Sequence, residues 1–439
     1  TNYFKKEKLP SEYNDAHAGL RGYANSDLES SVIFSAGMNP RLYGYIAQFD
    51  DFFPDKEGYI KKKIILKVSD FRSAIIQGKF LAKKGLWVSE YRIESGLNCG
   101  GHAFATEGFL MGPILAEFRD RRQELIDDTF MICKSALEVQ GKTIPGKKLT
   151  IKITAQGGVA TSEEHNFLIN HYNLDTVGWG TPFLLVPEAT TVDQDTRKQL
   201  IKAKEKDLYL SNISPLGVPF NSLRNSSKDI ERFQKIAEGK PGSSCPRKFL
   251  ALSNEYGTEG VCTASRLFQY NKIKEQGISD EITEKTCLCM GLAATAVINY
   301  KVDTRESKGV SICPGPNMAY FSKELSLPDM VYHIYNDMKE VVRIDRPNMF
   351  INELGMYLKY FSEKIKEHKE NWTIKSAKQL NTFADNMNHG LLYYQEMFSS
   401  IGEYFSNKKE SIDIALDDAM NSLNEMRSEI SFLINQNQK

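Results

Sequence analysis

The chain lacks three features: a long hydrophobic run, an excess of charge of either sign, and paired two-residue cysteine knuckles. Its 439 residues include 56 basic and 56 acidic side chains, so no net field attracts nucleic acid or a membrane surface. No apolar run reaches the length of a membrane span. The start, TNYFKKEKLP, is polar and charged, which is unlike a signal peptide. We therefore expect neither a nucleic-acid nor a membrane partner.

Cysteine is also sparse. Seven cysteines, an odd number in a long chain, favour a reducing compartment over a disulfide framework, so we expect a cytoplasmic location. No internal repeat or low-complexity tract is present. The length suffices for one large domain and a smaller one.

What is present is an alternation of strand and helix patterns that is typical of parallel βα units. Strands are expected at 31–34, 63–68, 86–93, 149–155 and 175–177. Helices are expected at 73–83, 112–140 and 162–171. Residues 186–320 look loop-rich, with one short strand at 207–213. Four helix candidates follow, which we interpret as a helical subdomain or a partner surface: 328–340, 349–370, 374–404 and 410–436.

The stretch 149–185 carries glycines directly after two expected strands. Gln156 is followed by Gly157 and Gly158, and the second strand ends in Gly178-Trp179-Gly180-Thr181, where a new helix is expected. Glycines at strand ends expose backbone N–H groups, which bind phosphate with help from a helix dipole. The last two βα units of a (β/α)8 barrel bind the phosphate of flavin mononucleotide (FMN) in this way. The alternative is that both sites are only tight turns.

The run from Lys63 to Val218 resembles the FMN-binding, synthase domain of glutamate synthase. The matching segments are Ile65-Leu66-Lys67-Val68, Ser95-Gly96 with Gly100-Gly101, Gln156-Gly157-Gly158, Gly178-Trp179-Gly180-Thr181 and Ser214-Pro215-Leu216-Gly217-Val218. The resemblance implies an FMN-dependent oxidoreductase on a TIM-barrel-like α/β fold, with Lys67 near the flavin. It further implies that Ser95, Gly100, Gly101, Gln156 and the glycine segments bind the cofactor.

The sequence departs from that family in three ways. Gln156 replaces the acid of an Asp-Gly-Gly motif, and Ser214 replaces the last of three iron–sulfur cysteines, so that cluster is not expected in its usual place. No amidotransferase half is found. Only about five strands precede Leu185, so the barrel is incomplete unless residues 186–320 or a preceding segment supply the rest. The expected divisions are an N-terminal extension at 1–30, the barrel part at 31–220, a cysteine-rich region at 221–325 and a helical subdomain at 326–439.

Five cysteines are crowded into 69 residues: Cys245, Cys262, Cys287, Cys289 and Cys313. A cysteine followed by proline, as at Cys245 and Cys313, is common at iron–sulfur ligands, and a cluster beside FMN could accept single electrons. Zinc is disfavoured because Cys-Leu-Cys is too tight for the usual pair. Free buried thiols remain the plain alternative.

Asn98-Cys99-Gly100-Gly101-His102 follows a strand and would lie at the catalytic face of a barrel. Cys99 could be a nucleophile and His102 an acid–base group, or both could be structural. We therefore expect a flavin-dependent oxidoreductase that acts on a small molecule, has a redox protein partner and forms an oligomer. Two alternatives stay open. One is a phosphate-substrate barrel enzyme with Cys99 as a covalent nucleophile, and the other is a non-enzymatic assembly protein that docks through its helical tail.

Overall fold

The structure is a computed structural model that describes residues 3–4, 7–35, 37–303, 308–370 and 372–437. It divides into two compact units, and each unit is built from three separate segments of the chain. Unit 1 comprises residues 1–95, 109–156 and 167–178, and unit 2 comprises residues 96–108, 157–166 and 179–439. The fourfold division expected from the sequence stays a prediction.

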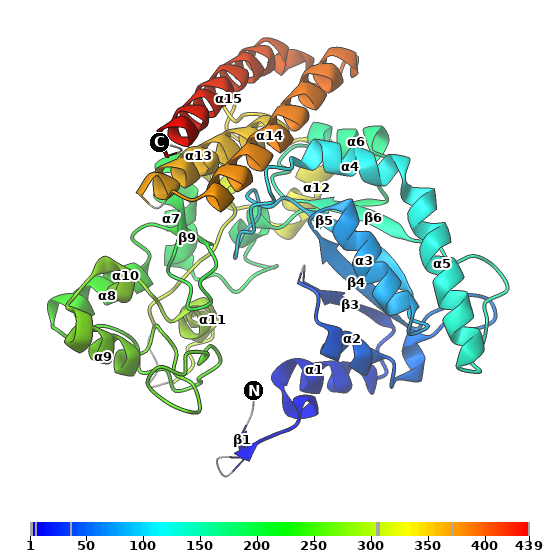
Figure 1. Cartoon of the computed structure of the whole chain (residues 1–439), viewed down its shortest axis with the longest axis horizontal. Helices are drawn as coiled ribbons and strands as arrows, with labels where there is room; N and C mark the ends of the chain where they lie inside the picture. The colour runs from blue at the N-terminus through cyan, green and yellow to red at the C-terminus, as the bar shows by residue number, and fades with distance from the viewer. Residues whose placement is uncertain (1–2, 5–6, 36, 304–307, 371, 438–439) are drawn as a thin grey trace. The chain divides into compact units, whose positions relative to one another are not determined.

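A parallel five-stranded sheet forms the centre of unit 1, as the alternating pattern predicts. Its strands are β3 (Ser30–Phe34), β4 (Lys62–Val68), β5 (Val88–Glu94), β6 (Lys152–Gln156) and β7 (Thr176–Gly178). They lie side by side in the order of the sequence (Figure 1), and every neighbouring pair is parallel. Within the described residues the sheet stays open, with β3 and β7 at its edges. The closed barrel is thus not formed by these strands.

Alternate residues divide the sheet into an apolar and a polar face. Leu66, Tyr91 and Ile93 are buried on the apolar face. Helix α3 (Phe71–Ala82) packs there on β4 and β5, and α5 (Arg122–Val139) packs on α3. Sequential strand order with right-handed crossovers places the connecting helices on one side of a sheet. The other face keeps charged side chains, such as Glu90 and Arg92, which form an ion pair.

Several helices of unit 1 differ in detail from the expectation. The segment 112–140 is two helices, α4 (Met111–Asp120) and α5, because the chain turns at Arg121. Two helices precede the second strand, α1 (Asp15–Ala24) and α2 (Pro40–Ile46), and α6 (Ser162–His171) is where the sequence predicts it. Two short strands near the N-terminus pair with each other, β1 (Tyr3–Phe4) and β2 (Glu7–Lys8).

Unit 2 is mostly helical, and the expectation of a loop-rich region at 186–320 is wrong in part. The helices there are α7 (Gln194–Lys202), α8 (Ser227–Ala237), α9 (Arg266–Gln276), α10 (Asp280–Thr283) and α11 (Leu288–Asn299). Ser226 and Ser265 cap α8 and α9 through their side chains, a signal that the polar composition obscured. The expected strand at 207–213 is β8 (Leu208–Ser211), which pairs antiparallel with β9 (Phe220–Leu223). These residues therefore do not complete the parallel sheet.

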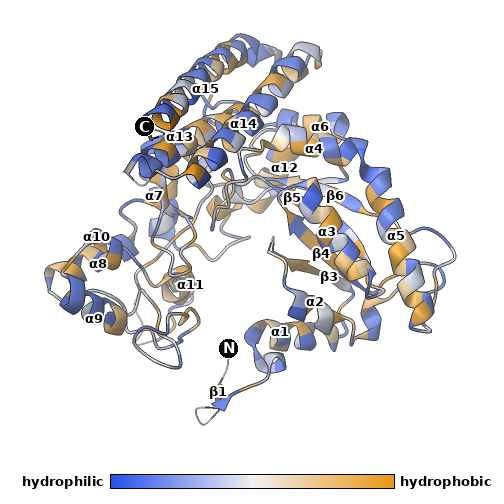
Figure 2. Ribbon diagram, viewed as in Figure 1, coloured by the Kyte–Doolittle hydropathy of each residue, from blue (hydrophilic) through white to orange (hydrophobic). Residues whose placement is uncertain are grey.

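The C-terminal helices follow the sequence closely. They are α12 (Leu327–Asn336), α13 (Met349–Glu370), α14 (Ile374–Ser400) and α15 (Lys409–Asn437). The last three pack against one another through buried side chains such as Phe361, Tyr394 and Leu423. Figure 2 shows hydrophobic and hydrophilic residues mixed along each of them, as expected for amphipathic helices. No described helix combines the length and hydrophobicity that crossing a bilayer requires.

The close packing of α3 on the sheet makes a testable prediction at Gly78. A Cβ atom there would overlap the hydroxyl group of the buried Tyr91 and lie 3.2 Å from Thr129 Cγ2. We expect Gly78→Ala to lower the free energy of unfolding by about 1–3 kcal/mol, as overpacking does. Chemical denaturation measures this loss. The control is Gly22→Ala in α1, where no atom lies within 4 Å, so this variant should be neutral or more stable.

Candidate functional site

The Asn98–His102 loop is the centre of the candidate site in unit 2, because other glycine motifs pack against it. A Cβ at Gly158 would overlap the Asn98 amide, and a Cβ at Gly100 would lie 2.6 Å from the Cys313 carbonyl oxygen. Gly101 N–H donates to that same oxygen over 3.2 Å. The structure therefore brings together the glycine pair after β6, the 98–102 loop and the Cys313-Pro314-Gly315 segment.

The Gly178-Trp179-Gly180-Thr181 motif joins this cluster through its last residue. Gly315 N–H donates to the Thr181 hydroxyl oxygen over 3.1 Å. Trp179 donates through its indole N–H to His165 Nδ1 over 3.1 Å. Gly178 itself belongs to unit 1, where a Cβ would lie 2.9 Å from Gln156 Cβ.

Gly180 differs from the other motif glycines. Its φ of −123° lies outside the left-handed range that favours glycine, and nothing lies within 4 Å of the position that a Cβ would take. Gly101 also has open space around it, although its φ of +78° already favours glycine. Gly180 is exposed, so there is space beside its backbone for another group.

His102 is held by its neighbours in a neutral form. Its Nε2 shares a 2.7 Å hydrogen bond with Ser214 Oγ, and its ring packs edge-on against Phe220 with 4.9 Å between centroids. Burial lowers the pKa of His102. Ser214 is fully buried. The Ser214 hydroxyl group thus orients the His102 ring.

Cys99 is half-buried, and its carbonyl oxygen accepts a 2.6 Å hydrogen bond from the side chain of Asn221. Tyr357, from α13, supports the same loop: its hydroxyl group shares a 2.8 Å hydrogen bond with Thr106 Oγ1. A Cβ at Gly96 would lie 2.6 Å from the Tyr357 hydroxyl oxygen. The helical tail is therefore structural support for the candidate site. Residue Tyr357 was not among the sequence candidates.

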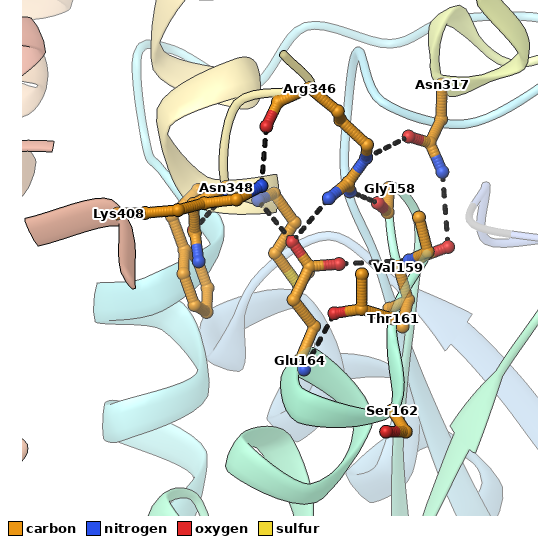
Figure 3. A network of polar contacts seen from close by, with 12 residues as sticks. Gly158, Val159, Thr161, Ser162, Glu164, Asn317, Arg346, Asn348 and Lys408 are labelled. Carbon is orange, nitrogen blue, oxygen red and sulfur yellow. Dashed lines mark hydrogen bonds and ion pairs between the residues drawn. The ribbon is translucent and has the colours of Figure 1, made fainter. Parts of the chain in front are cut away.

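A buried ion pair fixes the Gly157–Gly158 turn, whose φ angles are +116° and +83°. Arg346 Nη1 lies 2.7 Å from Glu164 Oε1, and Arg346 Nη2 donates to the Gly158 carbonyl oxygen over 2.5 Å. Arg346 Nε donates to Asn317 Oδ1 over 2.8 Å. Figure 3 shows these groups converging on the turn. Sequence patterns do not indicate this pair, because its members are 182 residues apart.

Backbone donors complete the coordination of the Glu164 carboxylate. Ala160 N–H donates to Oε2 over 2.9 Å, and Met349 N–H donates to Oε1 over 2.8 Å. Asn317 Nδ2 donates to the Val159 carbonyl oxygen over 3.1 Å. The residues after the glycine pair are thus held by buried polar contacts, which set the start of α6.

The helix-dipole part of the phosphate prediction needs correction at both turns. The helix expected at Thr181 is a single 3₁₀ segment, η3 (Thr181–Leu185), whose dipole is small. At the start of α6, the Asp337 carboxylate accepts from Ser162 N–H over 2.6 Å and from Ser162 Oγ over 2.8 Å. A protein carboxylate therefore occupies the position that an anion would take at this helix. Of the groups predicted to bind phosphate, only the backbone N–H groups of the glycine loops remain.

In unit 1, three polar residues meet near the carboxyl ends of adjacent strands. Lys67 Nζ lies 2.9 Å from Glu94 Oε2, and Gln156 Nε2 donates to Glu94 Oε1 over 2.8 Å. Ser95 N–H donates to the Gln156 carbonyl oxygen over 3.1 Å. Three sequence candidates, Lys67, Ser95 and Gln156, are thus close to Glu94, which was not a candidate. Period-two alternation could have found it, since Glu94 shares a face with Glu90 and Arg92.

Four of the five candidate cysteines lie together in unit 2. Each of Cys245, Cys262, Cys287 and Cys289 interacts electrostatically with at least one other of them. The pKa of Cys245 is lowered to about 6, chiefly because Cys262 donates a hydrogen bond to its thiolate. Cys313 packs instead against Ile213, Phe220 and Leu288. Among the described residues, no three His, Cys, Asp or Glu side chains are already arranged to hold a metal ion.

No protein-family model matches this sequence, and no curated protein matches it well enough to count as a relative. The function is therefore argued from the site itself.

The buried ion pair makes a prediction about stability. Arg346→Met would leave the Glu164 carboxylate buried without its cation, at a position where both side chains are almost fully enclosed (0% and 2% exposed). We expect a loss of about 3–5 kcal/mol in the free energy of unfolding. The control is Arg427→Met, which removes a more exposed ion pair with Asp385 and should cost about 0–1 kcal/mol. Equal losses in the two variants would contradict this account.

His333 makes a prediction about pH. Its Nδ1 accepts from Met338 N–H over 3.0 Å, so its Nε2–H donates to the Ala160 carbonyl oxygen over 2.9 Å. Burial lowers its pKa below the ordinary 6.5. The unfolded chain therefore binds the proton more readily, and stability falls as the pH drops below about 6.5.

Denaturation between about pH 5 and pH 7 measures this slope. We expect His333→Gln to reduce the slope. It should not abolish it, because burial also lowers the pKa values of His102, His165 and His171. The exposed His389, changed to Gln, controls for the substitution itself. An unchanged slope in His333→Gln would show that this imidazole already titrates freely.

Proposed function

We propose that this chain is an FMN-dependent oxidoreductase coupled to an iron–sulfur cluster. One observation carries the proposal. In unit 2, loop segments that are more than two hundred residues apart in the sequence contact one another. The Asn98–His102 loop, Gly158, Thr181 and Gly315 pack on one another, although no shared secondary structure requires it. Glycine-rich loops that converge in this way are typical of sites where backbone approaches a phosphate or a ring.

The sheet of unit 1 supports a barrel-like interpretation. Parallel strands in sequential order, with the helices on one face, are the arrangement found in part of a (β/α)8 barrel. The charged side chains on the other face, such as Glu90 and Arg92, differ from the mainly apolar interior of such a barrel. A doubly wound sheet would instead reverse its strand order at a switch point and carry helices on both faces. In a barrel, the carboxyl ends of the strands form the active-site face, and Glu94 and Gln156 end β5 and β6.

The residues of unit 2 fit a bound phosphate in part. The open space around Gly180 would admit a phosphoryl group against the backbone of the Trp179–Thr181 turn. The start of α6 does not fit, because the Asp337 carboxylate would repel an anion there. We therefore assign the phosphate to the turn that contains Gly180, and keep Gly157 and Gly158 as residues that shape the adjoining loop.

FMN, when bound, supplies hydride and single-electron chemistry at its ring. His102, neutral at pH 7 and oriented by Ser214, would donate or accept a proton at Nδ1 or Nε2. Cys99 would contact the substrate or the ring from the same loop. Lys67 near the flavin, a small-molecule substrate, a redox protein partner and an oligomeric state remain predictions.

The experiment is a visible absorption spectrum of the purified chain, followed by identification of any flavin that denaturation releases. The decisive variant is Gly180→Leu. No protein atom lies within 4 Å of the Cβ position, so leucine should meet no steric clash while its side chain fills the proposed phosphate position. We expect the flavin content to fall by about tenfold or more, which corresponds to about 1.4 kcal/mol of lost binding.

Gly355→Leu is the matched control, since Gly355 in α13 also has nothing within 4 Å of its Cβ position. It should retain flavin. A colourless wild-type protein at full purity, or full flavin content in Gly180→Leu, would contradict the proposal. Nucleotide protection of Cys99 from iodoacetamide in a flavin-free protein would instead favour the phosphate-substrate enzyme.

A further inference from the structure

We propose that unit 2 contains an oxyanion-binding site in a pocket beside α8. Its ligand is inorganic phosphate or the phosphate group of a larger molecule. Three parts of the chain line the pocket: α8, the turn at 242–243 and the segment at 285–286. None of them belongs to the Gly180 turn or to the Asn98–His102 loop, so the site is additional to the proposed flavin site.

Helix α8 turns its charged side chains toward the protein. Four charged residues share one face of the helix, because they are spaced at i, i+3, i+4 and i+7: Lys228, Glu231, Arg232 and Lys235. All four are buried or half-buried and line the pocket. The apolar Ile230 and Phe233 are instead exposed by 50% and 55%. A surface helix usually buries its apolar face, so this reversed orientation concentrates charge at the pocket.

Contacts at its first turn hold α8 in this orientation. Val310 N–H donates to Ser227 Oγ over 2.8 Å, and Lys228 N–H donates to the Val310 carbonyl oxygen over 3.2 Å. Gly309 lies directly against the charged face, where a Cβ atom would overlap Glu231 Oε2. The charged face is therefore held against the protein by backbone contacts and close packing.

Four basic side chains and one acidic side chain line the pocket, and their charges do not balance. Lys228 Nζ lies 2.9 Å from Glu231 Oε2, and Lys235 pairs with the other oxygen of the same carboxylate. Lys285 Nζ donates to the uncharged Asn212 carbonyl oxygen over 2.5 Å. Lys228 is buried, where positive charge without a full counter-charge is costly. An anion in the pocket would supply the missing negative charge.

Arg232 adds a hydrogen-bond donor that lacks an acceptor. Its Nε is enclosed and has no hydrogen-bond partner among the residues that the structure describes. Its Nη2 lies 3.8 Å from Asp229 Oδ1, which is longer than a hydrogen bond. Enclosed N–H groups are nearly always paired, and the guanidinium group is well suited to phosphate oxygens. An oxyanion beside Arg232 would supply the acceptor.

The other lining residues indicate which part of a ligand the pocket recognises. They are Gly242, Ser243 and Thr286, so no hydrophobic residue of the described chain lines it. Sites for flavins and other ring compounds are lined mainly by hydrophobic and aromatic side chains. The pocket therefore recognises the oxyanion group itself, and not a ring or an apolar chain.

The test is equilibrium dialysis of the full chain against labelled inorganic phosphate, at an ionic strength that sodium chloride keeps constant. We expect Arg232→Gln and Lys285→Gln each to weaken phosphate binding about tenfold, which corresponds to about 1.4 kcal/mol. The control is Lys274→Gln, which removes an exposed positive charge from α9 outside the pocket and should bind as the wild type does. Absence of phosphate binding by the wild type, or wild-type affinity in Arg232→Gln, would overturn the proposal.

Competition with glycerol 3-phosphate distinguishes the two sources of the oxyanion. Displacement of the label at lower concentrations than unlabelled phosphate requires would assign the site to a phosphate ester. Weaker displacement would assign it to free phosphate.

Acetylation of the wild-type lysines keeps the test decisive if a variant fails to fold. Phosphate should slow the acetylation of Lys235 and Lys285 and leave that of Lys274 unchanged. Equal protection of all three lysines, or protection of none, would contradict the proposed site.

Flavin content, measured in the same samples, separates this site from the proposed function. Arg232→Gln should keep the flavin that Gly180→Leu loses, because the two sites share no residue. Loss of flavin from folded Arg232→Gln would show that this pocket holds the flavin phosphate and is not an additional site. A flavin-free wild type that binds phosphate in the pocket would support the oxyanion site and contradict only the proposed oxidoreductase.

Discussion

The Arg346–Glu164 ion pair is the constraint on which the candidate site depends. Two enclosed charges are expensive to bury, and the structure offsets that cost by giving both groups several partners. The guanidinium group holds the Gly158 carbonyl oxygen, and the carboxylate holds Ala160 N–H. The turn after β6 is therefore fixed by the interior of unit 2. Contacts within the protein are sufficient to account for its conformation.

The same network links the helical tail to the loops. Lys408, just before α15, donates to the Arg346 carbonyl oxygen over 2.6 Å, and Met349 begins α13 with its N–H on Glu164. Tyr357, two turns along α13, holds the base of the 96–108 loop. The sequence suggested that the helical tail is a helical subdomain or a partner surface. In the structure, the tail also supports the loops of unit 2, and an assembly protein that docks through its tail would not need this support.

The glycines of the site serve different physical purposes. Gly158 and Gly100 are small because neighbouring groups lie where a side chain would be, and Gly157 needs its positive φ. Gly180 has neither a neighbouring group at its Cβ position nor a positive φ. Tight packing therefore accounts for glycine at some positions of the motifs, and the binding of phosphate at Gly180 stays a proposal. The Asp337 carboxylate already accepts a hydrogen bond at the start of α6, so this position is not available to an anion.

The sequence by itself determined the five parallel strands and the long C-terminal helices. Alternating apolar residues located the five parallel strands, and helical spacing located α13 and α15 to within one residue and the start of α14, because such periodicities are local. It also indicated which loops carry glycine, histidine and cysteine. It could not indicate Arg346, Asp337 or Tyr357.

The contacts of these residues join positions that are as many as 251 residues apart in the sequence. Only the tertiary structure decides such contacts, because the free energy that buries a charge or orients an imidazole comes from neighbours that packing, not sequence distance, selects.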